Sequence, residues 1–210
     1  MLERIRNFLK FNTKKSSNEK IKDLFKELRE DVVLIRLGED LTDYAELFKT
    51  IIQNLRAEIK SECGFILPEV RLQEGAWLQE NEYVVFIQGI NVYNGYLIPN
   101  VEGINDEFYE KFKTVVYDKM DNIFTNELTE KYIDSAEIKN GRLMWNIAQI
   151  LSVPEIKIIL SDIISNGKSI NNIGYVFEKI AEEILLNNSF SPFEKSKNLH
   201  EVAKKVAKVL

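Results

Sequence analysis

Residues 64–99 constrain the fold most, because apolar and polar side chains alternate there with a period of two. Three apolar runs, at 67–73, 83–88 and 91–98, are separated by turn residues that include Gly75 and Gly89. Pro68 cannot donate a hydrogen bond to a neighbouring strand, so it should open its strand or lie at an edge. The stretch therefore predicts a β-meander of three strands.

The residues before this stretch predict one more strand and a helix. Val32–Leu37 is apolar and β-branched, which is typical of a buried strand. Asp43 and Glu46 have the spacing of a capping box, and Gly64 suits the left-handed position that ends a helix. If the first strand pairs in parallel with 67–73, the helix between them is a right-handed crossover. The predicted core of this part contains Phe48, Ile52, Leu55, Val70, Val85 and Ile87.

Beyond residue 105 the apolar period changes from two to 3.6 and no strand signal recurs. Ser152 and Pro154 suit the start of one helix in this half. The sequence therefore predicts an α+β fold, in which a small β/α subdomain (strand, helix and three-strand meander, residues 31–99) precedes an all-helical subdomain (105–210). The expected helices span 108–124, 128–138, 143–151, 154–165, 170–186 and 199–210.

Residues 1–30 predict basic amphipathic helices and a linker. Leu2, Ile5, Phe8 and Leu9 recur at helical spacing, and the polar segment 12–17 lacks apolar periodicity. One interpretation is an anchor at a membrane surface. The other is a short helix that docks on the body of the protein or on a partner.

Charge is unevenly distributed along the chain. Residues 1–22 carry a net charge of +5 and residues 193–210 carry +3. The total net charge is −5, so the residues between these two segments carry −13. An acidic body would be repelled by a phosphate backbone, which argues against nucleic acid as a partner. The single cysteine excludes an intramolecular disulfide and fits a reducing cytoplasm.

Residues with catalytic potential are few. His200 is the only histidine, so a Ser-His-Asp relay or a two-histidine metal site is not expected. Cys63 is interpreted as a small half-buried residue near a helix end. The tripeptide Gly167-Lys168-Ser169 resembles part of a P-loop, but Asp162 occupies the place of the first glycine. We therefore expect no enzymatic activity, no cofactor and no metal.

Trp77 is the aromatic residue of most interest, because it lies in a turn-rich segment where full burial is difficult. It is either a lid over the sheet edge or part of a contact surface. Tyr93 and Tyr96 lie in the last strand of the predicted meander. These three residues are the candidate protein-binding site, and the alternative is that all three rings pack internally.

The same stretch resembles a known family, the FHIPEP family of flagellar (FlhA-like) and type III secretion export-gate proteins. The pattern G-[FIV]-x-x-P-x-V-x-[IL]-x-[DE], a polar turn, a strand that begins with tyrosine and G-V-x-[VI]-x-x-G is similar to this sequence. The helical half, in particular 149–156 and 176–181, also resembles the family. The matching positions are Gly64, Pro68, Val70, Leu72, Glu74, Tyr83, Gly89, Val92 and Gly95.

The resemblance implies a cytoplasmic domain, with a thioredoxin-like or ferredoxin-like first part, that docks export chaperones, substrates or other secretion components. It implies a cytoplasmic location, and the basic N-terminus is a candidate for peripheral contact with the inner membrane. Compared with the family pattern, we expect this sequence to be without the transmembrane block and the last subdomain, and we therefore expect weak or no self-association. The alternative is a structural or regulatory domain that kept the fold but lost the export role.

Overall fold

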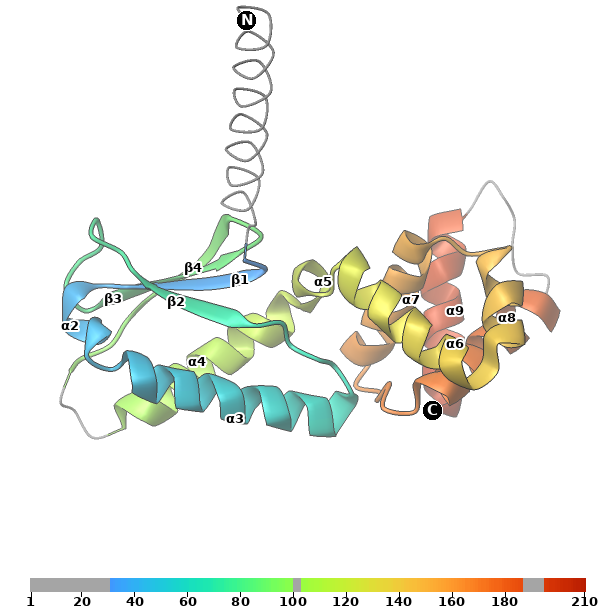
Figure 1. Cartoon of the computed structure of the whole chain (residues 1–210), viewed down its shortest axis with the longest axis horizontal. Coiled ribbons are helices and arrows are strands. Elements are labelled where there is room, and N and C mark those ends of the chain that lie inside the picture. Colours follow the sequence, from blue (N-terminus) through green and yellow to red (C-terminus); the bar gives the residue numbers. More distant parts are fainter. Residues whose placement is uncertain (1–30, 100–102, 187–194) are drawn as a thin grey trace, which may run out of the picture. The chain divides into compact units, whose positions relative to one another are not determined.

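The computed structural model describes residues 31–99, 103–186 and 195–210 (Figure 1). The chain divides into two units, residues 1–31 and residues 32–210. The helices and linker expected in residues 1–30 lie outside the described residues.

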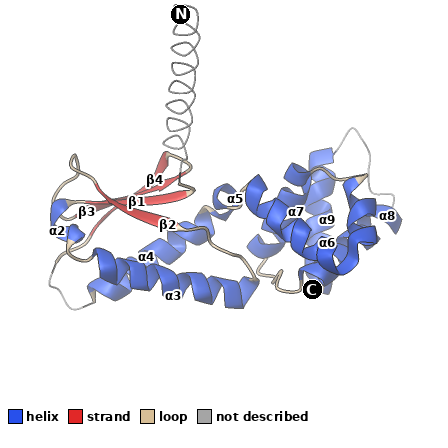
Figure 2. Cartoon of the chain, viewed as in Figure 1, coloured by secondary structure: helices blue, strands red, loops and turns tan. Residues whose placement is uncertain are grey.

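The first part of the second unit combines a sheet with helices (Figure 2). Helices α3 and α4 run below the sheet in this view and cover one of its faces. The α+β fold class predicted from the sequence is confirmed. The elements are β1 (Val33–Leu37), α2 (Glu39–Thr42), α3 (Ala45–Cys63), β2 (Val70–Glu74), β3 (Glu82–Ile87), β4 (Ile90–Tyr96) and α4 (Ile104–Asp118).

The four strands are ordered β2-β1-β3-β4. Strand β1 pairs in parallel with β2, which is the condition stated above for a crossover through α3, and it pairs with β3 antiparallel. The meander is wrong in one respect, because β1 lies between β2 and β3. Burial explains the order: β3 is apolar and almost wholly buried, whereas β2 carries exposed polar residues that suit an edge.

The structure differs from the sequence prediction at the start of β2 and at the start of α3. Strand β2 begins at Val70 rather than Leu67, so Pro68 precedes the strand. Asp43 does not cap α3, since Tyr44 occupies the N-cap position and no side chain bonds there. Gly64 does end α3, with a left-handed φ of 76°.

Aromatic rings form the centre of the core below the sheet. The rings of Phe48 on α3 and Phe108 on α4 lie 4.3 Å apart, and Tyr83 on β3 lies 5.6 Å from Phe108. Of the predicted core residues, Val70 is half-buried and the others are buried. Helix α4 thus packs on α3, while the division into subdomains 31–99 and 105–210 remains a prediction.

The remaining described elements are helical: α5 (Met120–Ile123), α6 (Asn126–Ala148), α7 (Val153–Ser165), α8 (Ile173–Leu186) and α9 (Lys195–Val209). Helix α6 is two helices joined at Asn140, whose φ of −150° is not helical, in agreement with the two helices expected there. At the start of α7 the Ser152 N–H donates to the Glu155 carboxylate at 2.8 Å. Within the described ranges, no helix is long and apolar enough to cross a membrane.

Candidate functional site

The face of the sheet that points away from α3 and α4, here called the outer face, is the first candidate site. Successive side chains of a strand point to opposite faces. Because Val33, Ile35 and Leu37 of β1 are buried on the helix side, Leu34 and Arg36 belong to the outer face. The register places Phe86 of β3 opposite Leu34 on this face. No described helix covers the outer face in Figure 2.

Arg36 contacts two aromatic rings on the outer face. Its guanidinium carbon lies 5.9 Å from the ring centre of Trp77 and 5.4 Å from that of Phe86. The Nε atom of Arg36 is buried and has no hydrogen-bond partner among the described residues. A guanidinium that lies over aromatic rings is stabilised by cation–π attraction.

The loop that carries Trp77 is fixed to the end of β1 by backbone hydrogen bonds. Gly75 N–H donates to the Leu37 oxygen at 2.8 Å, and Gly38 N–H donates to the Glu82 oxygen at 2.7 Å. A Cβ atom on Gly38 would lie only 2.0 Å from the Gln79 oxygen, so glycine is required for this close approach. The loop therefore presents Trp77 from a defined position.

The three predicted site residues do not share one face. Trp77 is 60% exposed and Tyr96 is 51% exposed. Tyr96 lies opposite Glu82 at the end of β4, and by alternation it belongs to the outer face. Tyr93 instead lies 5.8 Å from the buried ring of Tyr83, on the helix side. The structure thus brings Trp77 together with Arg36 and Phe86, which the sequence analysis missed.

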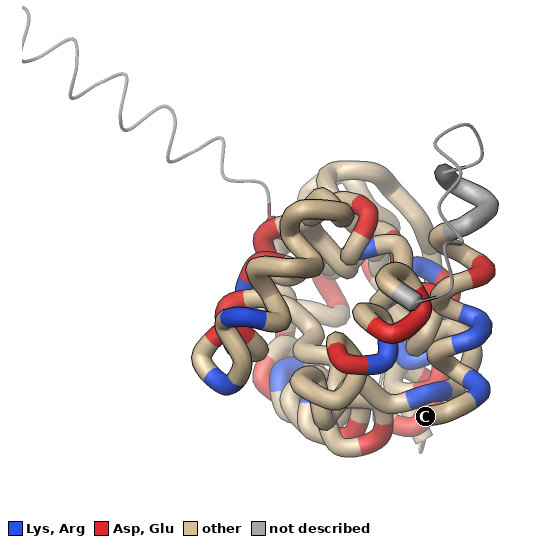
Figure 3. The backbone as a smooth tube through the Cα atoms, turned by 90° about the vertical axis from the view of Figure 1, so that its right-hand side faces the viewer, with Lys and Arg blue, Asp and Glu red and all other residues tan. Residues whose placement is uncertain are grey.

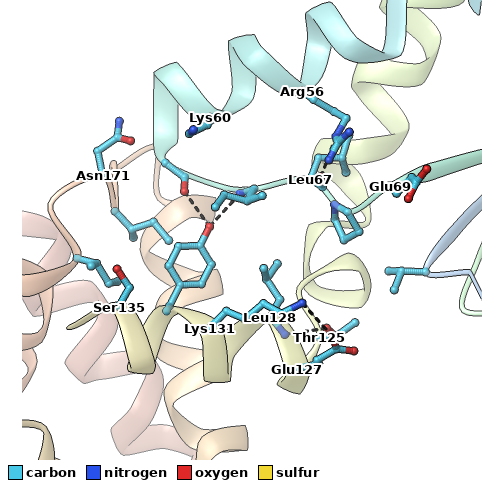
Figure 4. A pocket seen from close by; sticks show the side chains of 17 residues that line it. Arg56, Lys60, Leu67, Glu69, Thr125, Glu127, Leu128, Lys131, Ser135 and Asn171 are labelled. Atoms are coloured by element: carbon cyan, nitrogen blue, oxygen red, sulfur yellow. Dashed lines mark hydrogen bonds and ion pairs between the residues drawn. The ribbon is translucent and has the colours of Figure 1, made fainter. Parts of the chain in front are cut away.

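A pocket of about 490 Å³ is the second candidate site (Figure 4). Its floor is mostly apolar, and its basic lining residues come from α3 and α6. Arg56 is committed to the protein, since its Nε donates to the Leu67 oxygen at 3.0 Å. The lining includes Ile66, Leu67, Pro68, Leu128, Tyr132 and Ile173, with Arg56, Lys60 and Lys131 as the basic members.

The end of α3 forms one wall of this pocket and is tied to the helices beyond it. The Ile170 N–H donates to the Cys63 oxygen at 2.8 Å, and the Asn171 side chain donates to the Ser61 oxygen at 3.1 Å. Tyr132 contacts the same chain segment, at Gly64 and Ile66, through its hydroxyl group. The pocket is therefore part of the joint between the sheet region and the helical region.

Cys63 and His200, the two residues with catalytic potential, both make contacts within the folded protein. Cys63 is buried, and its thiol donates a hydrogen bond to the Ile59 carbonyl oxygen at 3.2 Å. Burial raises the pKa of this thiol. A raised pKa lowers the thiolate fraction that nucleophilic chemistry needs. His200 on α9 contacts the Asp162 carboxylate on α7 through its Nδ1 atom. That contact joins two packed helices.

Acidic and basic residues alternate along the backbone of the described elements. In the view of Figure 3, acidic and basic segments are interspersed over the same elements.

One polar cluster joins α3 to α4: the Glu58 carboxylate accepts hydrogen bonds from Lys113 at 2.5 Å and from the Tyr109 hydroxyl. These hydrogen bonds, that of Lys113 foremost, lower the pKa of Glu58.

Comparison with known proteins identifies a family region and a shared fold. Residues 7–108 match the model of the FHIPEP family. No curated protein matches the sequence. CdsV of Chlamydia pneumoniae superposes with a TM-score of 0.67 at 11% identity, over 84% of this chain and 65% of that one.

Two further structures are similar. A chain of the Chlamydia pneumoniae CdsV and CdsO complex gives a TM-score of 0.66 at 11% identity, over 83% of this chain and 68% of that one. Nonameric SctV-C of EPEC gives 0.61 at 15% identity, over 84% and 65%. This chain spans 65% of the length of CdsV, slightly less than two thirds. The resemblance stated from the sequence is confirmed: residues 7–108 are similar to the FHIPEP family, and the fold is that of the cytoplasmic domains of type III secretion export gates.

Proposed function

We propose that this chain is a non-enzymatic protein-interaction module of the export-gate type, which docks a secretion partner on the outer face of its sheet. The carrying observation is the exposed aromatic pair, Trp77 at 60% and Tyr96 at 51%, on the face where Arg36 lies over the Trp77 ring. The proposed partners are export chaperones, export substrates or other secretion components.

The physical properties of the outer face suit a protein partner. Tryptophan, tyrosine and arginine are enriched among the residues that dominate binding at protein interfaces, and the two aromatic side chains offer a large contact area at a small entropic cost. Trp77 and Arg36 stack on each other, so both are ordered before a partner arrives. Pre-ordering of this kind removes part of the cost of binding.

The similar structures support a function that depends on protein–protein contacts. CdsV is described in a complex with CdsO, and SctV-C is described as a nonamer. By analogy, we propose a cytoplasmic location for this chain, at or near the inner membrane. The buried Cys63 thiol and the His200–Asp162 contact support a role without catalysis.

A pull-down with three baits tests the proposal: the wild-type chain, Trp77→Ala and Trp145→Ala. Trp145 is a matched control, because it is 65% exposed and lies on α6, away from the sheet. Mass spectrometry of the captured proteins should show secretion components with the wild type and with Trp145→Ala. The Trp77→Ala chain should lose them and keep its melting temperature. Capture of the same components by Trp77→Ala would favour the structural or regulatory alternative.

A further inference from the structure

Strand β4 is an edge of the sheet with which no other described strand pairs. Of the two edge strands, β2 carries Arg71 and Glu74 and follows Pro68, and charges and prolines discourage pairing with another chain. Strand β4 has the sequence INVYNGY, which contains neither a charged residue nor a proline. Its ends expose Ile90 at 67% and Tyr96 at 51%. An edge of this composition is a template for one more strand.

The outward backbone groups of β4 follow from the register. The Leu97 N–H donates to the Asn81 oxygen at 3.0 Å. Antiparallel pairs alternate between hydrogen-bonded and non-hydrogen-bonded, and the next pairs are Glu82 with Tyr96 and Val84 with Asn94. The N–H and C=O groups of Tyr96 and Asn94 therefore point away from β3, toward the open edge.

One irregularity limits the usable length of this edge. The register of β4 on β3 shifts between Val85 and Phe86, which is a bulge. A bulge interrupts the ladder and discourages pairing next to it. The regular part of the edge therefore runs from Tyr93 to Tyr96.

An acidic hollow lies at the carboxyl end of β4. Pro99, three residues beyond Tyr96, lines a hollow of about 640 Å³ together with Glu39, Asp40 and Asp43. The other lining residues are Thr42 and Tyr44, so no basic side chain lines it. A segment that follows β4 past Tyr96 reaches this negative potential, which favours lysine or arginine at that end.

We propose that a partner protein binds β4 by strand addition, through an extended uncharged segment that carries a basic residue at the end near Pro99. This inference rests on the proposed function and names the binding mode of the partner. The backbone of the segment pairs with Asn94 and Tyr96, and its basic residue meets Glu39, Asp40 and Asp43. Main-chain hydrogen bonds provide the attraction, and the acidic hollow selects the sequence.

A synthetic peptide tests the proposal on the full chain. The probe is a capped peptide in which valine and threonine alternate. It has two lysines at each end, so that a lysine lies near Pro99 whether the peptide pairs parallel or antiparallel to β4. Nuclear magnetic resonance should show shifts of the Asn94 and Tyr96 amides, and their hydrogen exchange should slow about 10-fold, as for newly bonded amides. The same peptide with alternate backbone nitrogens methylated should not bind. A peptide with glutamate in place of lysine should bind more weakly.

A pair of variants separates the backbone of Tyr96 from its ring. Tyr96→Ala removes the ring and keeps the N–H, whereas Tyr96→Pro removes both. The proposal expects Tyr96→Pro to bind the probe at least about 10-fold more weakly than Tyr96→Ala, a loss of roughly one main-chain hydrogen bond. If Tyr96→Pro does not fold, the methylated peptide on the wild-type chain decides.

Two results would overturn the strand-addition proposal. One is equal binding of the methylated and unmethylated peptides, and the other is shifts confined to Arg71 and Gln73 on β2. Trp77→Ala separates this proposal from the proposed function, because it should still bind the strand peptide. If the peptide fails while capture of secretion components still depends on Trp77, strand addition is wrong and docking on the outer face stands.

Discussion

The hydroxyl group of Tyr132 donates a hydrogen bond to the Gly64 carbonyl oxygen at 2.8 Å, and it accepts one from the Ile66 N–H at 2.9 Å. Tyr132 lies on α6, whereas Gly64 ends α3. A Cβ atom on Gly64 would lie 2.5 Å from the Asn171 nitrogen, so the chain passes too close there for a larger residue. One side chain thus joins the sheet region to the helical region.

Tyr132→Phe should destabilise the protein. The substitution leaves the Gly64 carbonyl and the Ile66 N–H without this partner, which costs about 1–3 kcal/mol in the free energy of unfolding. Tyr117→Phe is the control, because it removes a hydrogen bond to Glu62 at the surface and should cost less than about 0.5 kcal/mol. Urea denaturation measures both. Equal midpoints for Tyr132→Phe and the wild type would show that the joint is not held by this hydroxyl.

Stability should fall at alkaline pH, in part because of the same residue. Burial raises the pKa of Tyr132 to about 12 from a usual value of 10. The folded state favours the neutral phenol, so this contribution is complete below pH 10 and is lost as the pH rises toward 12. The slope is at most about 1.4 kcal/mol per pH unit for one group. Urea midpoints at several pH values should show a difference between the wild type and Tyr132→Phe that narrows above pH 10; a constant difference would contradict the prediction.

Leu55→Ala should open a cavity beneath the sheet. Leu55 on α3 is fully buried, and truncation of a buried leucine costs about 2–5 kcal/mol. Gln53→Ala is the matched control, because Gln53 is exposed on the same helix and should change little. Thermal denaturation distinguishes the two variants. An unchanged melting temperature for Leu55→Ala would place this residue outside the core.

Tyr83→Phe should leave the protein as stable as before or stabilise it. The Tyr83 hydroxyl is buried and has no hydrogen-bond partner among the described residues, so its removal relieves a desolvation cost of up to about 1–2 kcal/mol. Gly95→Ala should act in the opposite direction, because its Cβ would lie 2.4 Å from the Tyr83 ring. Chemical denaturation compares them. A marked loss of stability in Tyr83→Phe would mean that the hydroxyl has a partner in solution.

Local patterns in the sequence predicted the elements better than their arrangement. The alternation in 83–88 identified a strand within one residue, and Gly64 identified the end of α3. The order of the strands depends on which edges of β1 are used, and no local pattern records that. The late start of β2 has a similar cause. The backbone of Ile66 and Leu67 forms hydrogen bonds with the side chains of Tyr132 on α6 and Arg56 on α3 instead of with a neighbouring strand.

The candidate site was predictable to the same degree. The turn-rich setting of Trp77 predicted a residue that is difficult to bury, and the structure leaves it exposed. Arg36 gave a weaker signal, a single charge in the apolar run 32–37, and its importance depends on the loop that brings Trp77 over it. Tyr93 and Tyr96 are three residues apart, and an odd spacing in a strand places them on opposite faces.

The stack of Arg36 on Trp77 can be tested by fluorescence, since the chain has two tryptophans and Trp145→Phe leaves Trp77 as the only emitter. In that background, Arg36→Met removes the guanidinium and exposes one more face of the indole ring. Acrylamide should therefore quench Trp77 more strongly. Stability should change by less than about 1 kcal/mol, because Nε of Arg36 has no hydrogen-bond partner among the described residues.

Arg71→Met is the control for this measurement, because Arg71 lies on the neighbouring strand β2 and by register on the same face. It should leave the quenching of Trp77 unchanged. Equal quenching in the Arg36→Met and parent chains would mean that the stack does not persist in solution. The outer face would then lack an ordered cation, and a partner would have to order both side chains as it binds, at a cost of about 0.5–1.5 kcal/mol for each.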